Sequence, residues 1–317
     1  MQCINQSDNL DKETIFHFLE DAAEIGVKAI NFVSDGESTC NPYLKDAILH
    51  GKSLGLDMAL GTNGYLLKDD ELVDILPALT YLRFNISAGE ADRYAYIHGV
   101  DERCFYKVKE TIQKAVKIKK DNSLDTTIGL QMVLMPEFAD QVIPLAKLGQ
   151  ELGVDYLVIK HCSDDEEGTL GVNYQDYEQL VDLLKEAETY STDSYYVKAK
   201  WSKILSEGHK CYKKCFGAPF ILQMSGTGLV APCGMFFNDK YKKYHIGNIK
   251  EKRFKEIWES KRYDEVMGLI RSEQFDPNRD CGTLCLHHNT NQVLWKIYED
   301  GTIPEVKGNK PQHLNFI

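Results

Sequence analysis

Apolar residues recur along the first half of the chain in two alternating patterns. Short, nearly continuous apolar runs predict β-strands, and longer segments with apolar side chains every three or four positions predict amphipathic α-helices. The strands are expected at residues 27–33, 56–61, 81–86, 126–134 and 156–160. The helices are expected at residues 15–25, 44–54, 69–76, 105–119 and 139–152.

Each predicted strand is paired with a helix, and glycine closes three of the helices, at Gly26, Gly55 and Gly153. Glycine is common just past a helix because it accepts the left-handed conformation that ends many helices. Such consecutive units form a parallel sheet or barrel with right-handed crossovers. We therefore predict an α/β fold built on a partial (βα) TIM-like barrel, with ligands at the carboxyl ends of its strands.

The character of the chain changes after about residue 164. One more helix is expected near residues 177–184 and one more strand near 195–200. We place a domain boundary next to Ser206, so that residues 1–206 form the partial barrel and residues 207–317 form a small C-terminal α+β module.

Composition and charge narrow the class of protein. Hydrophobic residues make up 43% and charged residues 27% of the 317 positions, as in globular proteins. The net charge of −11 argues against nucleic acid or an anionic membrane as the main partner. The chain has neither an apolar run of 18 residues nor an export signal at its start, so we expect a cytoplasmic location. In that compartment, nine cysteines indicate reduced thiols or metal ligands rather than disulfides.

Four cysteines dominate the last third of the chain. Cys215 and Cys233 flank an alternating segment with a Ser-Gly-Thr-Gly turn at residues 225–228, which predicts a hairpin that brings the two cysteines together. Cys281 and Cys285 follow as a close pair. Four thiolates suit an iron–sulfur cluster or a structural zinc ion, and the residues alone leave both open.

The spacing Cys-x12-Gly-x4-Cys, followed by the close pair, resembles the SPASM/twitch extension of radical S-adenosylmethionine enzymes. The segment His245 to Ser260 resembles the stretch that these modules carry between their cysteine pairs. The resemblance implies that Cys215, Cys233, Cys281 and Cys285 bind one auxiliary 4Fe–4S cluster. Cys211, four residues before Cys215, or a histidine remains an alternative ligand.

Polar residues after the predicted strands also resemble motifs of radical S-adenosylmethionine enzymes. Asp35-Gly36-Glu37 is similar to the Gly-Gly-Glu motif that holds the methionine amino group of S-adenosylmethionine, although Asp35 stands in the first glycine position. Without the resemblance, Glu37 is equally well explained as a loop acid that caps the next helix. The resemblance further implies that the cofactor contacts Thr62, Asn63, Asn85, Ser87 and Gln131.

The family's core 4Fe–4S cluster is held by three cysteines spaced Cys-x3-Cys-x2-Cys after the first strand. Cys3 lies 33 residues before Gly36, about where the third cysteine belongs. We therefore expect that the sequence lacks the first strand and two core ligands, which leaves the core cluster incomplete in this chain. The alternative is that Cys3 is an incidental thiol.

The resemblance implies a radical enzyme. Reductive cleavage of S-adenosylmethionine would give a 5′-deoxyadenosyl radical that abstracts hydrogen from an unidentified small-molecule or peptide substrate. A flavodoxin or ferredoxin would supply the electron, and neither nucleic acid nor a membrane is expected as partner. The alternative from another class is a non-catalytic remnant, a ligand-binding barrel with a structural metal site made of four cysteines.

Overall fold

The computed structural model describes residues 9–33, 36–164, 168–206, 209–282, 285–301, 303, 305 and 313–316. Contacts between Cα atoms divide these residues into two compact units. The first, which we call the sheet unit, comprises residues 29–162 and 172–206. The second, which we call the cysteine unit, comprises residues 9–28, the short segment 163–171 and residues from 209 onward.

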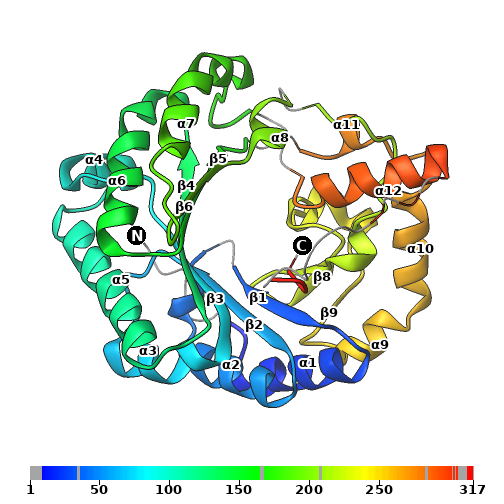
Figure 1. Ribbon diagram of the computed structural model, residues 1–317. Helices are drawn as coiled ribbons and strands as arrows, with labels where there is room; N and C mark the ends of the chain where they lie inside the picture. Colours follow the sequence, from blue (N-terminus) through cyan, green and yellow to red (C-terminus); the bar gives the residue numbers. More distant parts are fainter. Residues whose placement is uncertain are drawn as a thin grey trace. The chain divides into compact units, whose positions relative to one another are not determined.

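The sheet unit contains six described strands that pair side by side in chain order, and each pair is parallel (Figure 1). This arrangement confirms the predicted α/β fold with a partial barrel. The strands are β1 (Ala29–Phe32), β2 (Asp57–Thr62), β3 (Leu79–Asn85), β4 (Thr127–Leu134), β5 (Tyr156–His161) and β6 (Tyr196–Ala199).

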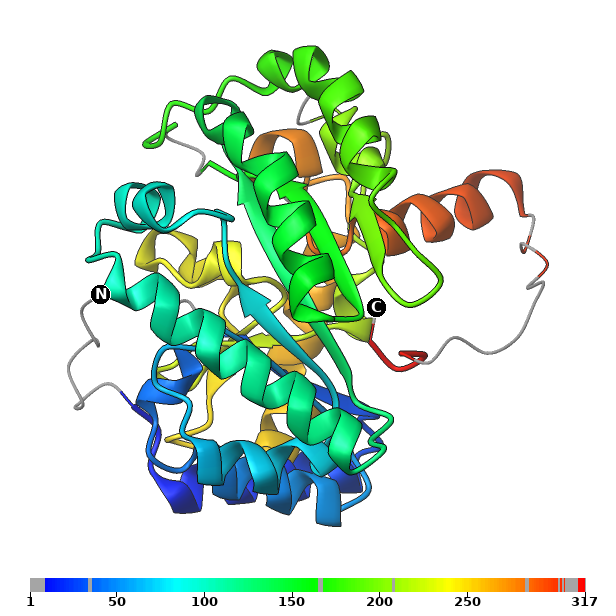
Figure 2. The same cartoon turned by 60° about the vertical axis from the view of Figure 1, so that its left-hand side comes forward.

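Helices cover one face of this sheet, and Figure 2 brings α5 and α6 to the front of it. Alternate strand residues such as Leu82, Leu130 and Ile159 are completely buried. The intervening residues of the strands point to the opposite face, which we call the inner face. The helices of the sheet unit are α2 (Leu44–Ser53), α3 (Asp69–Ile75), α4 (Ala91–His98), α5 (Arg103–Asp121), α6 (Val142–Leu152), α7 (Val181–Glu188) and α8 (Trp201–Ile204).

The cysteine unit has a three-stranded antiparallel sheet, in the order β7–β8–β9, and five α-helices among its described residues. The predicted hairpin is confirmed, because Gln223 of β7 pairs with Ala231 of β8. Its elements are α1 (Lys12–Glu24), β7 (Gln223–Met224), β8 (Leu229–Ala231), β9 (Gly247–Asn248), α9 (Phe254–Trp258), α10 (Lys261–Ile270), α11 (Pro277–Asp280) and α12 (His288–Asp300).

The differences between the structure and the sequence prediction in the sheet unit include α4, the predicted helix 139–152, and α8, a single turn that was not predicted. The helix α4 was not predicted, since it is short and only Tyr94 of its residues is buried. The predicted helix 139–152 is two elements, a 3-10 helix at Pro136–Gln141 and then α6. The boundary at residue 206 stays a prediction, while residues 9–28 group with the cysteine unit. In the described part of the chain, no helix is long and apolar enough to cross a membrane.

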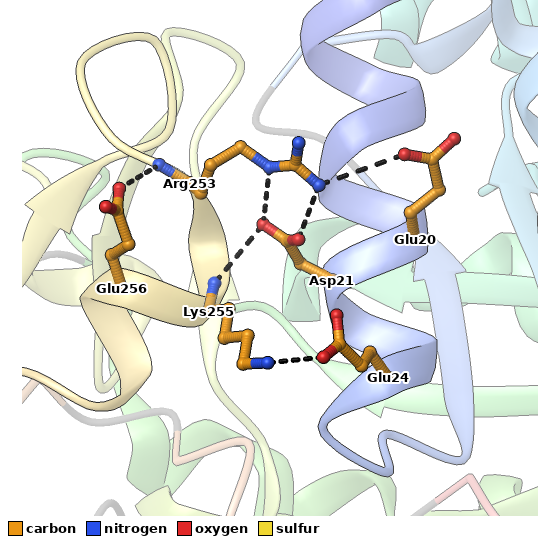
Figure 3. A network of polar contacts seen from close by, with 6 residues as sticks. All are labelled: Glu20, Asp21, Glu24, Arg253, Lys255 and Glu256. Atoms are coloured by element: carbon orange, nitrogen blue, oxygen red, sulfur yellow. Dashed lines mark hydrogen bonds and ion pairs between the residues drawn. The ribbon is translucent and has the colours of Figure 1, made fainter.

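An ion pair between α1 and the start of α9 ties distant parts of the cysteine unit together (Figure 3). The Asp21 carboxylate is buried and accepts hydrogen bonds from Arg253 Nε at 2.9 Å and Nη2 at 2.6 Å. It also accepts the backbone N–H of Lys255 at 3.3 Å. This bidentate pairing satisfies a carboxylate that burial would otherwise destabilise.

Neighbouring charges extend this contact. Lys255 Nζ pairs with Glu24, and the guanidinium of Arg253 lies 3.8 Å from Glu20 (Figure 3). At the same helix start, the backbone N–H of Arg253 donates to the Glu256 carboxylate at 3.0 Å, which satisfies a donor that the helix leaves free.

We expect Asp21→Ala to lower the free energy of unfolding by about 2 kcal/mol, because the substitution leaves a guanidinium and a backbone N–H without their acceptor. Denaturation by urea measures the loss. Glu20→Ala is the control, since its exposed carboxylate is 3.8 Å from Arg253 and should contribute less than about 0.5 kcal/mol. Equal losses in the two variants would contradict this account.

The same contact has a pH dependence. Burial by itself raises the pKa of Asp21, but the hydrogen bonds from Arg253 and Lys255 outweigh it and hold the pKa below its usual value of 3.8. The ionised carboxylate therefore stabilises the fold above the unfolded pKa, and this contribution is lost as the pH falls through the lower, folded pKa. The difference in unfolding midpoint between the parent and Asp21→Asn should be constant near neutral pH and shrink below pH 3.8.

Candidate functional site

The carboxylate of Glu37 joins the ends of the first two strands of the sheet. Its Oε1 accepts the Thr62 hydroxyl at 2.6 Å, the Thr39 hydroxyl at 2.8 Å and the Thr39 backbone N–H at 3.1 Å. Its Oε2 accepts the backbone N–H of Asn63 at 2.7 Å. Glu37 therefore caps the 3-10 helix at Ser38–Cys40 rather than the predicted helix 44–54, and it also fixes that loop to the end of β2.

The Thr-Asn-Gly sequence at the end of β2 forms a tight turn. Thr62 is 1% exposed, and its hydroxyl also accepts the backbone N–H of Gly64 at 3.0 Å. Gly64 has a φ of +78°, and a Cβ on it would come within 2.7 Å of the Phe84 ring. Only glycine fits this turn without strain, and the turn directs Asn63 to the edge of the sheet.

The next two strands bring further polar side chains to the same edge. Asn85 of β3 and Gln131 of β4 are partners in the parallel register, and Gln131 Nε2 donates to Asn85 Oδ1 at 2.9 Å. Ser87 follows β3 and accepts the backbone N–H of Val133 at 3.3 Å. The predicted residues Glu37, Thr62, Asn63, Asn85, Ser87 and Gln131 thus lie along the carboxyl ends of four adjacent strands. Gly36 also follows β1, whereas Asp35 and Cys3 lie outside the described residues.

In the cysteine unit, Cys215, Cys233, Cys281 and Cys285 line a single cavity. Among the described residues, no three His, Cys, Asp or Glu side chains are close enough to share a single metal ion. The walls around the four thiols are mainly apolar, and the other lining residues are Lys210, Tyr212, Pro232, Phe236, Ile270, Phe275, Pro277, His287 and Asn291.

Glycine shapes the hairpin between the first two of these cysteines. Gly228 has a φ of +88°, and a Cβ on it would lie 2.7 Å from Asn248 Oδ1. The Ser225 backbone N–H donates to Leu229 O at 2.9 Å, which closes the turn. The fixed glycine in the Cys-x12-Gly-x4-Cys spacing is therefore required by the backbone of the turn.

Asn291 of α12 was missed from the sequence. It is completely buried, and its Oδ1 accepts the backbone N–H groups of Phe216 and Gly217 at 2.7 and 2.8 Å. Its Nδ2 lies 3.5 Å from Cys215 Sγ and 3.9 Å from Cys285 Sγ. A single amide thus orders the chain beside one cysteine and offers N–H groups to two sulfurs. Because it is 76 residues from Cys215, no local pattern indicated it.

The four thiols share a buried environment. Burial raises the pKa of Cys233 to about 12 and also raises the pKa values of Cys215 and Cys281. Such thiols remain protonated at neutral pH, unless bound iron replaces the protons. Cys211, by contrast, is exposed and is not among the residues lining the cavity. The four thiols, the amide N–H groups and the mainly apolar walls fit an iron–sulfur cluster.

Two family models match the chain. The one described as "Radical SAM superfamily" matches residues 4–148, and the one described as "SPASM: Iron-sulfur cluster-binding domain" matches residues 215–286.

Two curated relatives cover most of the chain. A "tungsten-containing aldehyde ferredoxin oxidoreductase cofactor-modifying protein" of Pyrococcus furiosus is 23% identical over 87% of this chain and 80% of its own length. An "AdoMet-dependent heme synthase" of Methanosarcina barkeri is 26% identical over 77% of this chain and 72% of its own.

Among solved structures, Streptococcus suis SuiB bound to S-adenosylmethionine superposes with a TM-score of 0.63, at 16% identity over 82% of this chain. The match spans only 60% of SuiB. SuiB bound to its precursor peptide SuiA gives a TM-score of 0.60 at 15% identity, with the same coverage of both chains. These likenesses confirm the fold, a partial barrel with a small C-terminal module.

We predict that each of Cys215→Ala, Cys233→Ala, Cys281→Ala and Cys285→Ala loses the iron and sulfide of one cluster. Each variant should also become cleavable by protease beyond residue 209, because binding energy at such a site is also folding energy. Cys211→Ala is the matched control and should keep both its iron and its resistance. Iron loss in the Cys211 variant, with iron retained in the Cys215 variant, would show that Cys211 and not Cys215 is the ligand. Zinc in anaerobically purified protein would favour the structural alternative.

We expect Asn291→Asp to lower the midpoint potential of the cysteine-bound cluster by on the order of tens of millivolts. The substitution replaces N–H groups by negative charge beside two sulfurs, and such changes disfavour the reduced cluster. A redox titration followed by electron paramagnetic resonance measures it. Gln292→Glu is the control, since its amide contacts Cys211 at 3.7 Å. An unchanged potential in Asn291→Asp would contradict the assignment.

Proposed function

We propose that this chain, which belongs to the radical SAM superfamily and carries a C-terminal SPASM domain, is an enzyme that cleaves S-adenosylmethionine reductively and abstracts hydrogen from its substrate. The observation that carries the proposal is the row of polar side chains along the carboxyl ends of β1 to β4. In a parallel α/β fold this edge is where ligands bind.

Glu37 is the residue that we assign to the methionine ammonium of the cofactor. Its Oε1 accepts three hydrogen bonds, whereas Oε2 accepts only one. Because a carboxylate has about four lone pairs, two on each oxygen, Oε2 keeps a position for an ammonium donor. The contacts from Thr62 and Asn63 hold the carboxylate in place before the cofactor arrives, which reduces the entropy lost on binding.

We assign the remaining edge residues to the nucleoside part of the cofactor. Asn85, Ser87 and Gln131 present hydroxyl and amide groups, which can both donate to and accept from ribose hydroxyls. Asp35, Gly36 and Cys3 keep their predicted roles as part of the proposal, the last as a ligand of the core cluster.

The core 4Fe–4S cluster, when bound and reduced, supplies the electron that yields a 5′-deoxyadenosyl radical from S-adenosylmethionine. A flavodoxin or ferredoxin is the donor that we propose for it. In the cysteine unit, Cys215, Cys233, Cys281 and Cys285 would occupy all the ligand positions of one auxiliary cluster. Full ligation by protein suits electron transfer or stabilisation of the unit better than direct contact with substrate.

The substrate is proposed only as a class. SuiB is described in complex with a precursor peptide, while the two curated relatives are named for modifying a cofactor and for making heme. The relatives that this chain matches over most of their length therefore favour a small molecule over a peptide.

Formation of 5′-deoxyadenosine tests the activity. The protein is purified without oxygen, reconstituted with iron and sulfide, and reduced in the presence of S-adenosylmethionine. It is prepared with any residues that are encoded upstream of Met1. Failure to form 5′-deoxyadenosine in a preparation with its full iron content would contradict the proposal and favour the non-catalytic alternative.

We expect Glu37→Gln to weaken S-adenosylmethionine binding at least about tenfold, because a charge-assisted hydrogen bond contributes about 1.5–3 kcal/mol. Titration calorimetry measures the affinity. The substitution also places an amide where Oε2 accepts the Asn63 N–H, so the unfolding midpoint should fall as well.

Thr39→Val separates these two effects. It removes one hydroxyl donor to Glu37 and leaves the carboxylate itself in place. We expect this control to lose some stability and to bind the cofactor within about threefold of the parent, since the charge is retained. A Glu37→Gln variant that bound S-adenosylmethionine as tightly as the parent would show that the motif assignment is wrong.

A further inference from the structure

Three cationic side chains belong to the inner face of the sheet unit, on β3, on β5 and just after β6. Arg83 lies in the middle of β3, Lys160 near the end of β5, and Lys200 directly after β6. Arg83 points to the inner face because side chains alternate along a strand, so that residues 81, 83 and 85 share the face that carries Asn85. In a chain with a net charge of −11, such a group of cations needs an explanation.

The strands on both sides of Arg83 carry glycine opposite it. Gly61 of β2 and Gly129 of β4 are its two partners in the parallel register. A Cβ on Gly61 would come within 3.3 Å of Arg83 Nη2, so the guanidinium lies across that glycine. A Cβ on Gly129 would overlap the Tyr156 ring at 2.1 Å. The two glycines thus make room for a long cationic side chain and for a flat ring on the inner face.

No carboxylate neutralises any of these three cations within the described structure. Among the residues described, no Asp or Glu oxygen lies within 4.0 Å of the guanidinium nitrogens of Arg83, the ammonium of Lys160 or that of Lys200. The Nε–H of Arg83 is buried and has no hydrogen-bond partner. A buried donor without an acceptor costs stability, and more so when the group is charged.

The three cations also act on one another. Burial, and then the charge of Arg83, lower the pKa of Lys160 to about 8. Burial and then Arg83 likewise lower the pKa of Lys200, although Lys200 as a whole is exposed. Lys203 and Lys200 add to the repulsion at Lys160, and Cys162 opposes it. Like charges held together without counter-charges destabilise the site, and a bound anion removes that cost.

We propose that Arg83, Lys160 and Lys200 form an anion-binding site on the inner face of the sheet, which holds a carboxylate or phosphate group of the substrate. This proposal rests on the proposed function, because it assumes that the chain is an enzyme with a substrate. It defines that substrate as a small anionic molecule. A guanidinium matches the planar fork of a carboxylate or the oxygens of a phosphate, and the two ammonium groups on β5 and after β6 add positive charge on one side of it.

S-adenosylmethionine has a carboxylate of its own, so the cofactor could also supply the anion that binds at this site. Arg83 precedes Asn85 by two residues, so its Cα lies about 7 Å further from the carboxyl edge of the sheet. Lys160 pairs with Val133, two residues beyond Gln131, so the two lysines lie nearer that edge and their side chains must reach inward to meet an anion held by Arg83. We assign the anion to the substrate because Arg83, its deepest contact, lies below the side chains that we assign to the cofactor.

The test uses the full chain at pH 7 with inorganic phosphate as the probe. The unfolding midpoint is followed against phosphate concentration, with sodium chloride at equal ionic strength as reference. The parent should show a saturable, phosphate-specific rise. Arg83→Gln and Lys160→Gln should each bind phosphate at least about tenfold more weakly, and Arg83→Lys should recover part of the affinity.

Lys198→Gln is the matched control, because it removes the same charge from β6 at a lysine that pairs with Glu188 at 3.4 Å. It should bind phosphate as the parent does. The glutamine variants at Arg83 and Lys160 should melt no lower than the parent without phosphate, since they remove charges without partners. Their failure to bind phosphate is then not explained by unfolding.

A second arm measures S-adenosylmethionine binding to the same proteins. The proposal predicts unchanged cofactor affinity in Arg83→Gln and no competition between cofactor and phosphate. Loss of cofactor binding together with competition would overturn it, because the anion would then be the carboxylate of the cofactor. A parent that binds the cofactor but shows no phosphate-specific rise would overturn the anion site alone. Phosphate binding without any 5′-deoxyadenosine would support the site and contradict only the proposed activity.

Discussion

Parallel pairing of the strands is the constraint on which the sheet unit depends. Neighbouring strands lie about 4.8 Å apart, and in a parallel sheet all their carboxyl ends meet at one edge. The loops after β1 and β2 must share that edge, and Glu37 joins them with hydrogen bonds from Thr39, Thr62 and Asn63. The same register places Arg83 between two glycines on the inner face. A slip of one residue would turn that guanidinium toward the helices, so register determines both the polar edge and the cationic group.

Period and turn chemistry in the sequence were enough to predict the strands of the sheet and the hairpin. The residues along the carboxyl edge were predicted only from the resemblance to radical S-adenosylmethionine enzymes. The partners of Glu37 were not predictable, because Thr62 and Asn63 are 25 and 26 residues away and only the register brings them close. For the same reason the cluster of Arg83, Lys160 and Lys200 was missed, since one cation on a strand gives no sign of the next. The helix α4 was missed because its exposed polar residues give little periodicity.

In the cysteine unit the positions of the cysteines were predictable from nearby sequence, whereas the side chain that orders them comes from far along the chain. The spacing of its cysteines is a local signal, and the hairpin with Gly228 follows from the chemistry of the turn. What orders the thiols is distant, since Asn291 on α12 supports the chain beside Cys215 and faces Cys285 as well. A small unit with short strands has a limited hydrophobic core, so a buried amide of this kind, and the cluster that we propose for the four cysteines, would contribute much of its order.

The path of the chain between the two units has a consequence for dissecting the protein. The chain passes from one unit to the other near residues 28, 162, 171 and 207, so the units are interleaved rather than arranged in tandem. A fragment that ends at residue 206 would carry α1 without Arg253 and Lys255, the partners of its buried Asp21. The complementary fragment would carry the two cations without the carboxylate. Cutting the chain at residue 206 thus separates Asp21 from its partners, and a C-terminal fragment that keeps this contact needs residues 9–28 joined to it.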